Sequence, residues 1–373
     1  MEAHKKARGK IEIRGKLSLT SKEDLSIVYT PGVAGPSRAI HDNPESAKDL
    51  TAMKNSVAII TDGSAVLGLG DIGPEAALPV MEGKALLFKT FAGIDAFPIT
   101  LSVREIEDIV GAIAAIAPTF GGINLEDISA PRCFEIERRL AQELPIPVFH
   151  DDKDGVAIVV LAGLMNSLEV IRKKKENIRI VINGAGAAGT GILKLLSLWG
   201  ISRISILDRG GIISDERKDL SPHKKEFLPL LDPAIKKGGL ADALSGADVF
   251  IGVSVGGVLH EKAIRNMNAD AVVFALANPD PEIMPEAAKR GGARIVATGR
   301  SDFVNQINNA LVFPGLFKGL LDARLILVTD RMKIAVASAL AGLIPDPAEE
   351  KIIPDIFDIR VVDAVAQTVK RFA

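Results

Sequence analysis

The feature that most constrains the fold of this chain is a glycine-rich turn between an apolar strand and an apolar helix. Residues 178–198 read as a strand, three closely spaced glycines and the start of a helix. The first glycine permits a tight turn, the second lets the backbone approach a pyrophosphate, and the third lets the helix pack on the strand, while the helix amides face the phosphates. The predicted phosphate-binding residues are Gly184, Gly186, Ala187, Ala188 and Gly189. A glycine-rich turn in another kind of α/β domain is the alternative.

The segments after this turn favour dinucleotide binding. Short apolar runs alternate there with helix-length segments, at residues 178–182, 204–207, 249–253, 272–275 and 295–297. This repetition predicts a doubly wound parallel sheet of the Rossmann type. The second run ends in Asp208, where a carboxylate accepts the ribose hydroxyls of NAD and repels a 2′-phosphate, whereas the adjacent Arg209 is able to pair with that phosphate. The sequence therefore leans toward NAD but leaves the choice between NAD and NADP open. Ser254, after the third run, and Asn278 are further predicted cofactor contacts.

The first part of the chain is organised differently, and the change comes near residue 153. Apolar runs lead there into Gly or Asp clusters, at residues 57–60, 84–89, 123–125 and 148–150, with a helix-like stretch at 102–117. This pattern also indicates the α/β class. We expect residues 1–153 to form an N-terminal α/β substrate- and metal-binding domain, and residues 154–373 a Rossmann-type domain with a helical C-terminal tail. The sequence does not say which domain the tail packs against.

Carboxylates follow two of the runs in the first part of the chain. Glu126 and Asp127 follow one run, and Asp151 and Asp152 follow the next. Strand ends cluster at one edge of an α/β sheet, so these acids are able to converge. Carboxylates that meet in one place must share protons or bind a cation, and oxygen-only ligands suit Mg²⁺ or Mn²⁺. Ordinary helix caps or loop acids are the alternative.

Four other polar residues are candidates for chemistry. Lys84 heads an apolar stretch; alone it reads as a snorkelling surface lysine, but a nearby divalent cation would disfavour its ammonium form and make it a base. Tyr29 is the only tyrosine of the chain, and a buried structural role is an equal alternative. Asn278 and Asn309 stand at strand or turn ends, where amides bind substrate carboxylates but more commonly form Asx turns.

Composition excludes several functional classes. The 45 Lys and Arg nearly balance the 47 Asp and Glu, so no overall field holds the chain on nucleic acid or an anionic membrane. The longest apolar runs are about half of what a bilayer requires, and the N-terminal stretch lacks the apolar centre of an export signal. Cys133 is the only cysteine and has no internal disulfide partner, which fits a reducing compartment. We expect a cytoplasmic protein with a small-molecule substrate and neither nucleic acid nor membrane as partner.

Taken in order along nearly the whole chain, these motifs resemble those of malic enzymes in their short prokaryotic form. The matching segments are residues 29–34, 61–64, 67–73, 83–84, 91–95, 121–133 and 150–152, the turn at Gly184, and residues 308–315. The resemblance implies metal-dependent oxidative decarboxylation of L-malate to pyruvate and CO₂ with reduction of NAD or NADP. It also implies decarboxylation of oxaloacetate, and a homodimer or a larger homo-oligomer.

The resemblance also implies a role for each candidate residue. The implied metal ligands are Glu126, Asp127 and Asp152, the implied general base is Lys84 and the implied general acid is Tyr29, with substrate contacts at Lys89, Asn278 and Asn309. Two places depart from the family. Short members commonly read Gln-His-Gly-Thr after the second Asp, where this chain has residues 153–156 as Lys-Asp-Gly-Val, and larger relatives carry a malate-binding arginine where this chain has Ala65. The cation that holds the second carboxylate of malate is therefore open.

Two other functions compete with this interpretation. A non-decarboxylating NAD(P)-dependent hydroxy-acid dehydrogenase would share the dinucleotide turn, although in malate and lactate dehydrogenases that turn lies near the N-terminus. A catalytically inactive dinucleotide sensor would keep the turn and lose turnover, and Asp154 and Val156, close to the predicted metal ligands, keep this alternative open. Release of CO₂ separates the first alternative from a malic enzyme, and metal-dependent reduction of NAD(P) separates the second.

Overall fold

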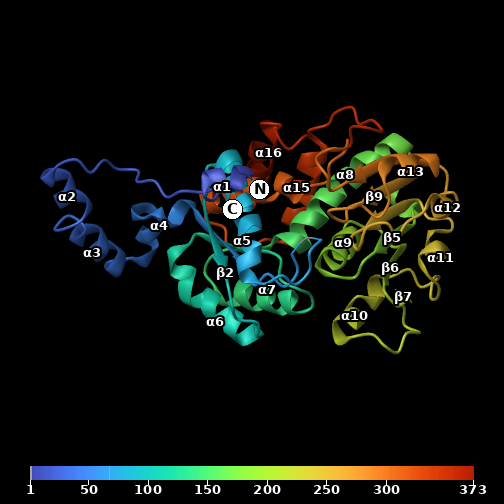
Figure 1. Ribbon diagram of the computed structural model, residues 1–373, viewed down its shortest axis with the longest axis horizontal. Coiled ribbons are helices and arrows are strands. Elements are labelled where there is room, and N and C mark those ends of the chain that lie inside the picture. Colours follow the sequence, from blue (N-terminus) through green and yellow to red (C-terminus); the bar gives the residue numbers. More distant parts are fainter. Residues whose placement is uncertain (1, 67) are drawn as a thin grey trace.

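Two sheets of mainly parallel strands form the framework of the protein in the computed structural model, which describes residues 2–66 and 68–373 (Figure 1). The first sheet has the order β2-β1-β3-β4 and the second the order β10-β9-β8-β5-β6-β7, with β7 antiparallel to β6. The strands of the first sheet are β1 (Ser56–Thr61), β2 (Asp95–Thr100), β3 (Gly122–Leu125) and β4 (Val148–His150). Those of the second are β5 (Ile180–Asn183), β6 (Ile204–Asp208), β7 (Gly211–Ile212), β8 (Val249–Gly252), β9 (Ala271–Ala275) and β10 (Ala293–Thr298). The predicted α/β class with a Rossmann-type sheet is confirmed.

Helices cover both faces of the first sheet, because successive residues of β1 point to opposite sides. Val57 and Ile59 join one core cluster with residues of α5 (Pro74–Ala92), while Ala58 and Ile60 join another with residues of α6 (Ile106–Ile116) and α7 (Arg132–Glu143). The apolar run at residues 84–89 lies inside α5 rather than in a strand. The buried residues of α5 recur every three or four positions, as on one face of a helix: Ala77, Met81, Lys84, Ala85 and Phe88. Strand β2 escaped the sequence analysis because it is a half-buried edge strand that contains Pro98.

The second sheet is also covered on both faces, as a doubly wound fold requires. Its helices are α8 (Val156–Ile171), α9 (Ala187–Leu198), α10 (Pro222–Glu226), α11 (Leu240–Leu244), α12 (Glu261–Ile264) and α13 (Pro285–Arg290). Residues of α8 and α9 pack on one face, and residues of α11, α12 and α13 on the other. The helical stretch Asp151–Ile171 is long and apolar enough to cross a membrane, but 78% of its apolar window is buried in the protein, as in a core helix.

The C-terminal helices contact both domains, which answers the question that the sequence left open. They are α14 (Phe313–Ala323), α15 (Asp330–Ala341) and α16 (Arg360–Lys370). From α14, the Phe313 ring lies 4.7 Å from that of Phe88 on α5, and the Phe317 ring lies 6.1 Å from that of Phe149 on β4. Helix α15 packs on α8 and α16. The tail therefore joins the N-terminal domain to the Rossmann-type domain through one continuous core.

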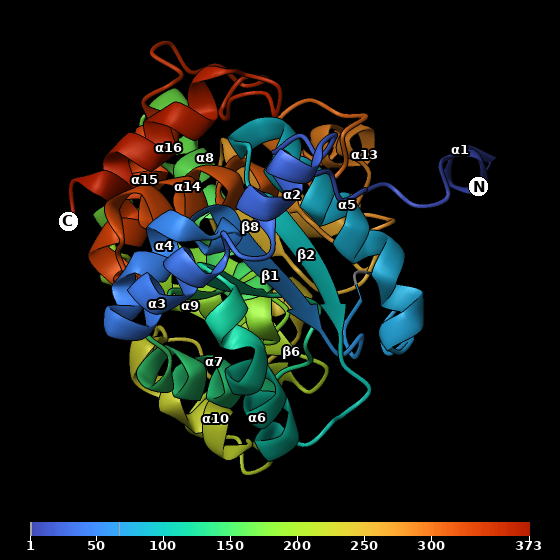
Figure 2. The ribbon, with the colours of Figure 1, turned by 90° about the vertical axis from the view of Figure 1, so that its left-hand side faces the viewer.

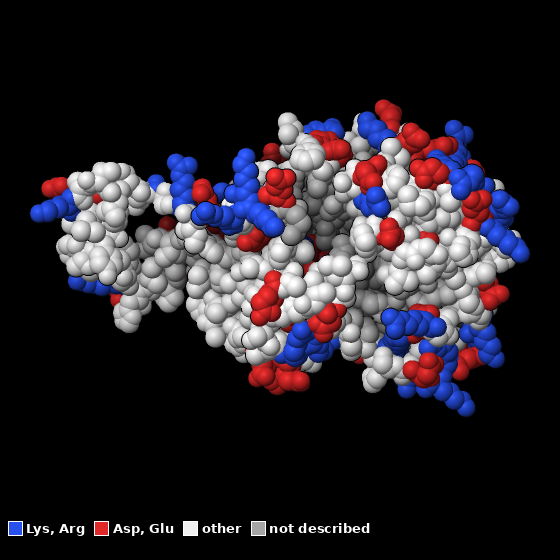
Figure 3. Space-filling view, viewed as in Figure 1, with Lys and Arg blue, Asp and Glu red and all other residues white. Residues whose placement is uncertain are grey.

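The N-terminal residues form an arm that projects from this body (Figures 1 and 2). The arm holds α2 (Lys22–Val28), α3 (Ala34–Asp42) and α4 (Ala47–Leu50), whereas α1 (Glu2–Ala7) lies apart from it in both views. No residue of α2 or α3 is buried. Large apolar side chains are exposed along the arm, among them Ile13, Leu17, Leu19, Ile27 and Tyr29. In the space-filling view the projecting part carries few charges, whereas both signs are interspersed over the body (Figure 3).

Short 3₁₀ turns connect several of these elements. They are η1 (Pro44–Ser46), η2 (Ala52–Asn55), η3 (Ala117–Thr119), η5 (Lys175–Asn177), η6 (Leu228–Leu230) and η7 (Asn309–Leu311). One irregular turn matters for the site: η4 (Asp151–Gly155) is a π-helical turn that leads from β4 into α8. A π-helical turn of this kind is frequently found at functional sites.

Candidate active site

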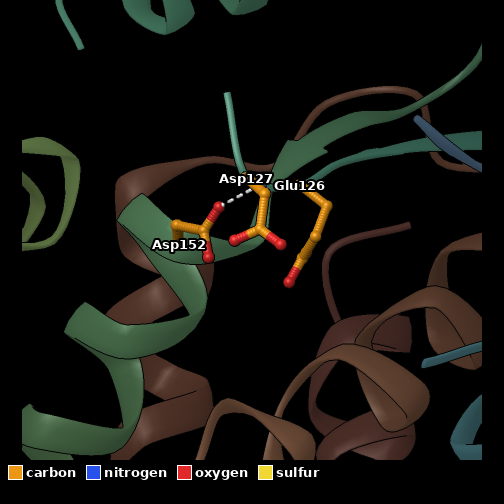
Figure 4. Close-up of side chains that lie close together, drawn as sticks. All are labelled: Glu126, Asp127 and Asp152. Atoms are coloured by element: carbon orange, nitrogen blue, oxygen red, sulfur yellow. Dashed lines mark hydrogen bonds between the residues drawn. The ribbon is translucent and has the colours of Figure 1, made fainter. Parts of the chain in front are cut away.

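Three carboxylates meet where the first sheet ends. Glu126 and Asp127 follow β3, and Asp152 lies in the π-helical turn after the neighbouring parallel strand β4. Their ligand oxygens all lie within 4.8 Å of one another, and the backbone N–H of Asp127 donates to Oδ2 of Asp152 at 2.7 Å (Figure 4). The parallel register of β3 and β4 therefore brings together acids that are 25 residues apart in the sequence.

The electrostatics of this cluster fit a divalent cation. Burial and the charge of Asp127 raise the pKa of Asp152 to about 7, and burial and the charge of Asp152 raise the pKa of Glu126 well above its ordinary value. Three buried or half-buried carboxylates are thus costly to ionise together without a compensating charge. A donor set made only of carboxylate oxygens is what Mg²⁺ and Mn²⁺ prefer. The cluster supplies three such ligands and leaves other coordination positions for a substrate.

Lys84 lies on α5 with its ammonium group against the same cluster. Its Nζ lies 2.6 Å from Oε2 of Glu126, contacts Oδ2 of Asp151, and lies 4.5 Å from the centre of the Phe313 ring. Burial opposes the charge of Lys84, but the carboxylates of Asp151 and Glu126 outweigh burial and raise its pKa above the ordinary value. With these acids uncompensated, Lys84 is held as an ammonium ion. A cation that engages Glu126 would weaken this hold on the proton.

These groups line one cavity of about 780 Å³ between the two domains. The N-terminal domain contributes Lys84 and the three acids, and the Rossmann-type domain contributes Ser254, Asn278 and Asn309. Ser254 Oγ accepts a hydrogen bond from Nδ2 of Asn183 at 2.8 Å, which fixes the loop after β8. The structure therefore brings the proposed base, metal ligands and substrate amides into a single space.

The glycine turn has the shape that a dinucleotide requires. Gly184 has φ +123°, and a Cβ there would lie 2.5 Å from the carbonyl oxygen of Val253. A Cβ at Gly189 would lie 1.8 Å from the carbonyl oxygen of Gly184, so the helix and the turn pack too closely for any side chain. In contrast, a Cβ at Gly186 would meet nothing within 4 Å, and α9 begins at Ala187 directly behind it. This open surface before a helix N-terminus suits a pyrophosphate, as predicted for the glycine turn.

Asp208 stands at the end of β6 as predicted, but two cations that the sequence analysis missed hold it. Nη1 of Arg217 donates to Oδ1 of Asp208 at 2.6 Å, and Nζ of Lys224 contacts Oδ2. Partial burial raises the pKa of Asp208, but these hydrogen bonds outweigh burial and keep it below its ordinary value. The position predicted to contact the ribose thus combines a carboxylate with Arg217, Lys224 and the adjacent Arg209, so the choice between NAD and NADP stays open.

Two of the predicted catalytic and substrate-binding residues do not line this cavity. Tyr29 follows α2 on the projecting arm, is 66% exposed, and is not among the residues that line the cavity. Lys89 lies near the end of α5, where its Nζ pairs with Oδ1 of Asp95 at 2.7 Å; it lines a separate groove under the N-terminal segment. The cavity is instead lined by Lys10, which the sequence analysis did not single out.

The structure also accounts for the unusual residues after Asp152. Asp154 is buried and accepts ion pairs from Lys333 on α15 at 2.9 Å and from Lys153 at 3.5 Å. Lys153 also pairs with Glu137 on α7. The acid that departs from the family pattern is therefore a counter-ion between the π-helical turn and the C-terminal helices, and it does not belong to the group of three converging carboxylates.

Comparisons with known proteins agree with this geometry. The family model of the malic enzyme N-terminal domain matches residues 8–141, and that of the malic enzyme NAD binding domain matches residues 154–373. The chain is 52% identical to the NAD-dependent malic enzyme of Geobacillus stearothermophilus over 97% of this chain and 76% of that protein. It is 49% identical to the bifunctional malic/malolactic enzyme of Bacillus subtilis over 100% of this chain and 92% of that protein.

A solved crystal structure is also similar to this chain in both sequence and fold. The crystal structure of the NAD-dependent malic enzyme of Thermotoga maritima superimposes with a TM-score of 0.96 at 48% identity, and the match covers 99% of this chain and 98% of that one. The relatives use both dinucleotides, since the NADP-dependent malic enzyme of Halomonas elongata is 43% identical over 98% of this chain and 90% of that protein.

Proposed function

This chain belongs to the malic enzyme family, and we propose how its own residues divide the work of that family's reaction. The reaction is the oxidative decarboxylation of malate to pyruvate and CO₂ with reduction of NAD or NADP. One observation carries the assignment: the three converging carboxylates and Lys84 face the dinucleotide-binding loops across a single cavity.

The acids Glu126, Asp127 and Asp152 would hold Mg²⁺ or Mn²⁺. When bound, such a cation supplies Lewis-acid chemistry, by holding the hydroxy-acid end of malate and stabilising negative charge that develops on its oxygens. The protein's part is to place three oxygen ligands on adjacent strand ends, where the hydrogen bond from Asp127 to Asp152 fixes their relative positions. Asp151 stays beside Lys84 as its counter-ion.

Lys84 is the proposed general base. Its Nζ accepts the proton of the C2 hydroxyl as the C2 hydride passes to the nicotinamide. The amine of Lys84 must therefore be neutral when the substrate is bound. The loops after β8 and β9 present Ser254 and Asn278 to the cofactor, and Asn309 faces the substrate from η7. Phe313 and the apolar lining limit access of water to the Lys84 amine.

Tyr29 is the proposed donor of the proton to C3, and we propose that it acts in the cavity of a second copy of the chain. It follows α2 on the arm and does not line the cavity of its own chain, yet it is the only tyrosine of the chain. The arm exposes Ile13, Leu17 and Ile27, which a lone copy would leave in water. A homodimer in which each arm covers the other body would bury these side chains and bring the partner's Tyr29 to the site.

The experiment that tests the proposed function is an assay of NADH or NADPH formation with L-malate and Mn²⁺, with pyruvate and CO₂ measured in the same samples. We expect equal amounts of the three products and complete loss of activity in EDTA. Oxaloacetate accumulating without CO₂ would indicate a non-decarboxylating dehydrogenase instead. Dinucleotide binding without any turnover would indicate a sensor.

A further inference from the structure

We propose that Lys10 binds the second carboxylate of malate, the group that leaves as CO₂, and so selects a dicarboxylic hydroxy acid over a monocarboxylic one. The inference rests on the proposed function and concerns a residue that neither the predicted site nor the family motifs include.

The charged side chains that line the cavity suggest which cation binds the second carboxylate of malate. Among the described residues that line it, the acids are Glu126, Asp127 and Asp152, and the basic side chains are Lys84 and Lys10. Lys84 is occupied by its carboxylate partners. Malate carries two negative charges, and the metal ligands can serve only its hydroxy-acid end. Lys10 is thus the lining cation that remains for the other end.

The position of Lys10 is fixed by the helix that carries Lys84. Its Nζ donates to the carbonyl oxygen of Pro79 at 2.6 Å, and its backbone N–H donates to Oε2 of Glu82 at 3.2 Å. Both partners lie on α5, within five residues of Lys84. These contacts hold the extended segment after α1 against the outer turns of α5, beside Gly83 and Leu87 of the cavity wall.

The ammonium group of Lys10 has no carboxylate partner among the described residues. Within residues 2–66 and 68–373, no ion pair engages its ammonium group, whereas Lys16 and Lys89 both pair with Asp95. The Pro79 carbonyl satisfies one of its three N–H donors and none of its charge. An ammonium group with free donors, on a half-buried residue at a cavity wall, is suited to a carboxylate ligand.

The test is direct calorimetric titration of the Mn²⁺-loaded protein, without dinucleotide, with L-malate and with oxalate. Oxalate chelates a metal as the hydroxy-acid end of malate does but has no distal carboxylate. We expect Lys10→Met and Lys10→Gln to weaken L-malate binding by roughly 10- to 100-fold, as for loss of a charged hydrogen bond, and to leave oxalate binding within about twofold. Lys10→Arg should recover most of the affinity. Lys6→Met, at an exposed lysine of the preceding helix α1, should change the binding of neither ligand.

Two results would overturn the inference. Unchanged malate affinity in both neutral variants would show that Lys10 does not contact the distal carboxylate. Equal losses for malate and oxalate would show that Lys10 supports α5 and the metal site rather than the substrate. Because Lys10→Gln keeps a donor for the Pro79 carbonyl, it separates charge from packing even if Lys10→Met unfolds. A wild-type protein that never turns malate over would instead refute the proposed function.

Discussion

The substitution Asp152→Asn should stabilise the metal-free protein while it weakens metal binding. In the fold, burial and the charge of Asp127 raise the pKa of Asp152 from 3.8 to about 7. Each pKa unit corresponds to about 1.4 kcal/mol, so an ionised Asp152 would cost about 4 kcal/mol in full. The side chain is 26% exposed, and allowance for screening by solvent reduces this cost to about 2 kcal/mol. An amide avoids this cost of ionisation, and its oxygen can still accept a hydrogen bond from the backbone N–H of Asp127.

The pH dependence follows from the direction of this shift. Because the folded pKa lies above the unfolded value, the penalty is absent below about pH 4, grows as the pH rises, and is complete above about pH 7. In EDTA, Asp152→Asn should therefore melt roughly 4 °C above wild type at pH 8, and the gap should be smaller at pH 5.5. With Mn²⁺ at 100 times its dissociation constant, wild type gains about 2.7 kcal/mol and the order reverses.

The assay is thermal unfolding of both proteins in EDTA and in Mn²⁺ at the two pH values. Asp363→Asn is a matched control, because Asp363 is an exposed acid on α16, far from the cluster in sequence and outside the cavity lining. It should shift the melting temperature by less than about 1 °C in every condition. If Asp152→Asn is less stable than wild type in EDTA, the carboxylates do not repel one another in the metal-free protein. If Mn²⁺ stabilises both proteins equally, Asp152 does not help to hold a cation, and the argument for a cation site fails.

Three further predictions concern other parts of the site. Lys84→Ala should lower turnover of malate by about 10² to 10⁴ while dinucleotide binding, measured by fluorescence titration, is retained; unchanged turnover would remove Lys84 from the mechanism. The Lys84→Ala and Tyr29→Phe proteins should each be nearly inactive. When the two are mixed and reassembled, they should regain up to about a quarter of wild-type activity if each cavity takes Tyr29 from the other copy. No recovery would show that Lys84 and Tyr29 of the same chain act together. Lys333→Met should destabilise the fold by about 3 kcal/mol in urea unfolding because it removes a partner of buried Asp154, and adding Asp154→Asn should restore most of the loss; equal stabilities of the single and double variants would contradict this.

Much of the fold was predictable because local pattern and tertiary structure agree in the Rossmann-type domain. Runs such as residues 204–207 and 272–275 are buried on both faces in β6 and β9, so hydrophobicity alone reveals them. Strand β2 fails this test because it is an edge strand with a proline, and the 84–89 run fails it because a buried helix and a buried strand look alike over six residues. The acids after β3 and β4 were predictable together, since the ends of neighbouring parallel strands meet by topology.

The rest of the site depends on contacts that no local pattern reveals. Lys10 reaches the cavity only because its segment lies against α5, about 70 residues further along the chain. Lys333 meets Asp154 only through the docking of α15 on α8. Such pairings are set by tertiary packing, and the residue types involved are among the commonest on protein surfaces. Their roles therefore become visible only in the folded structure.

The shared use of Glu126 links two functions of the site that the sequence presents as separate. In the fold, Oε2 of Glu126 accepts a hydrogen bond from Nζ of Lys84 at 2.6 Å, and the same side chain belongs to the group of three acids that can hold a cation. Glu126 cannot give its full charge to both. While Glu126 is paired with Lys84, the Lys84 amine stays protonated and cannot act as a base. Once a bound cation neutralises the charge of Glu126, Lys84 retains only Asp151 as a close anionic partner, and the pKa of Lys84 must fall. A base produced only when the cluster is loaded would keep Lys84 inert in the metal-free protein, so metal affinity and the acid limb of the pH–rate profile should change together in any variant of Glu126.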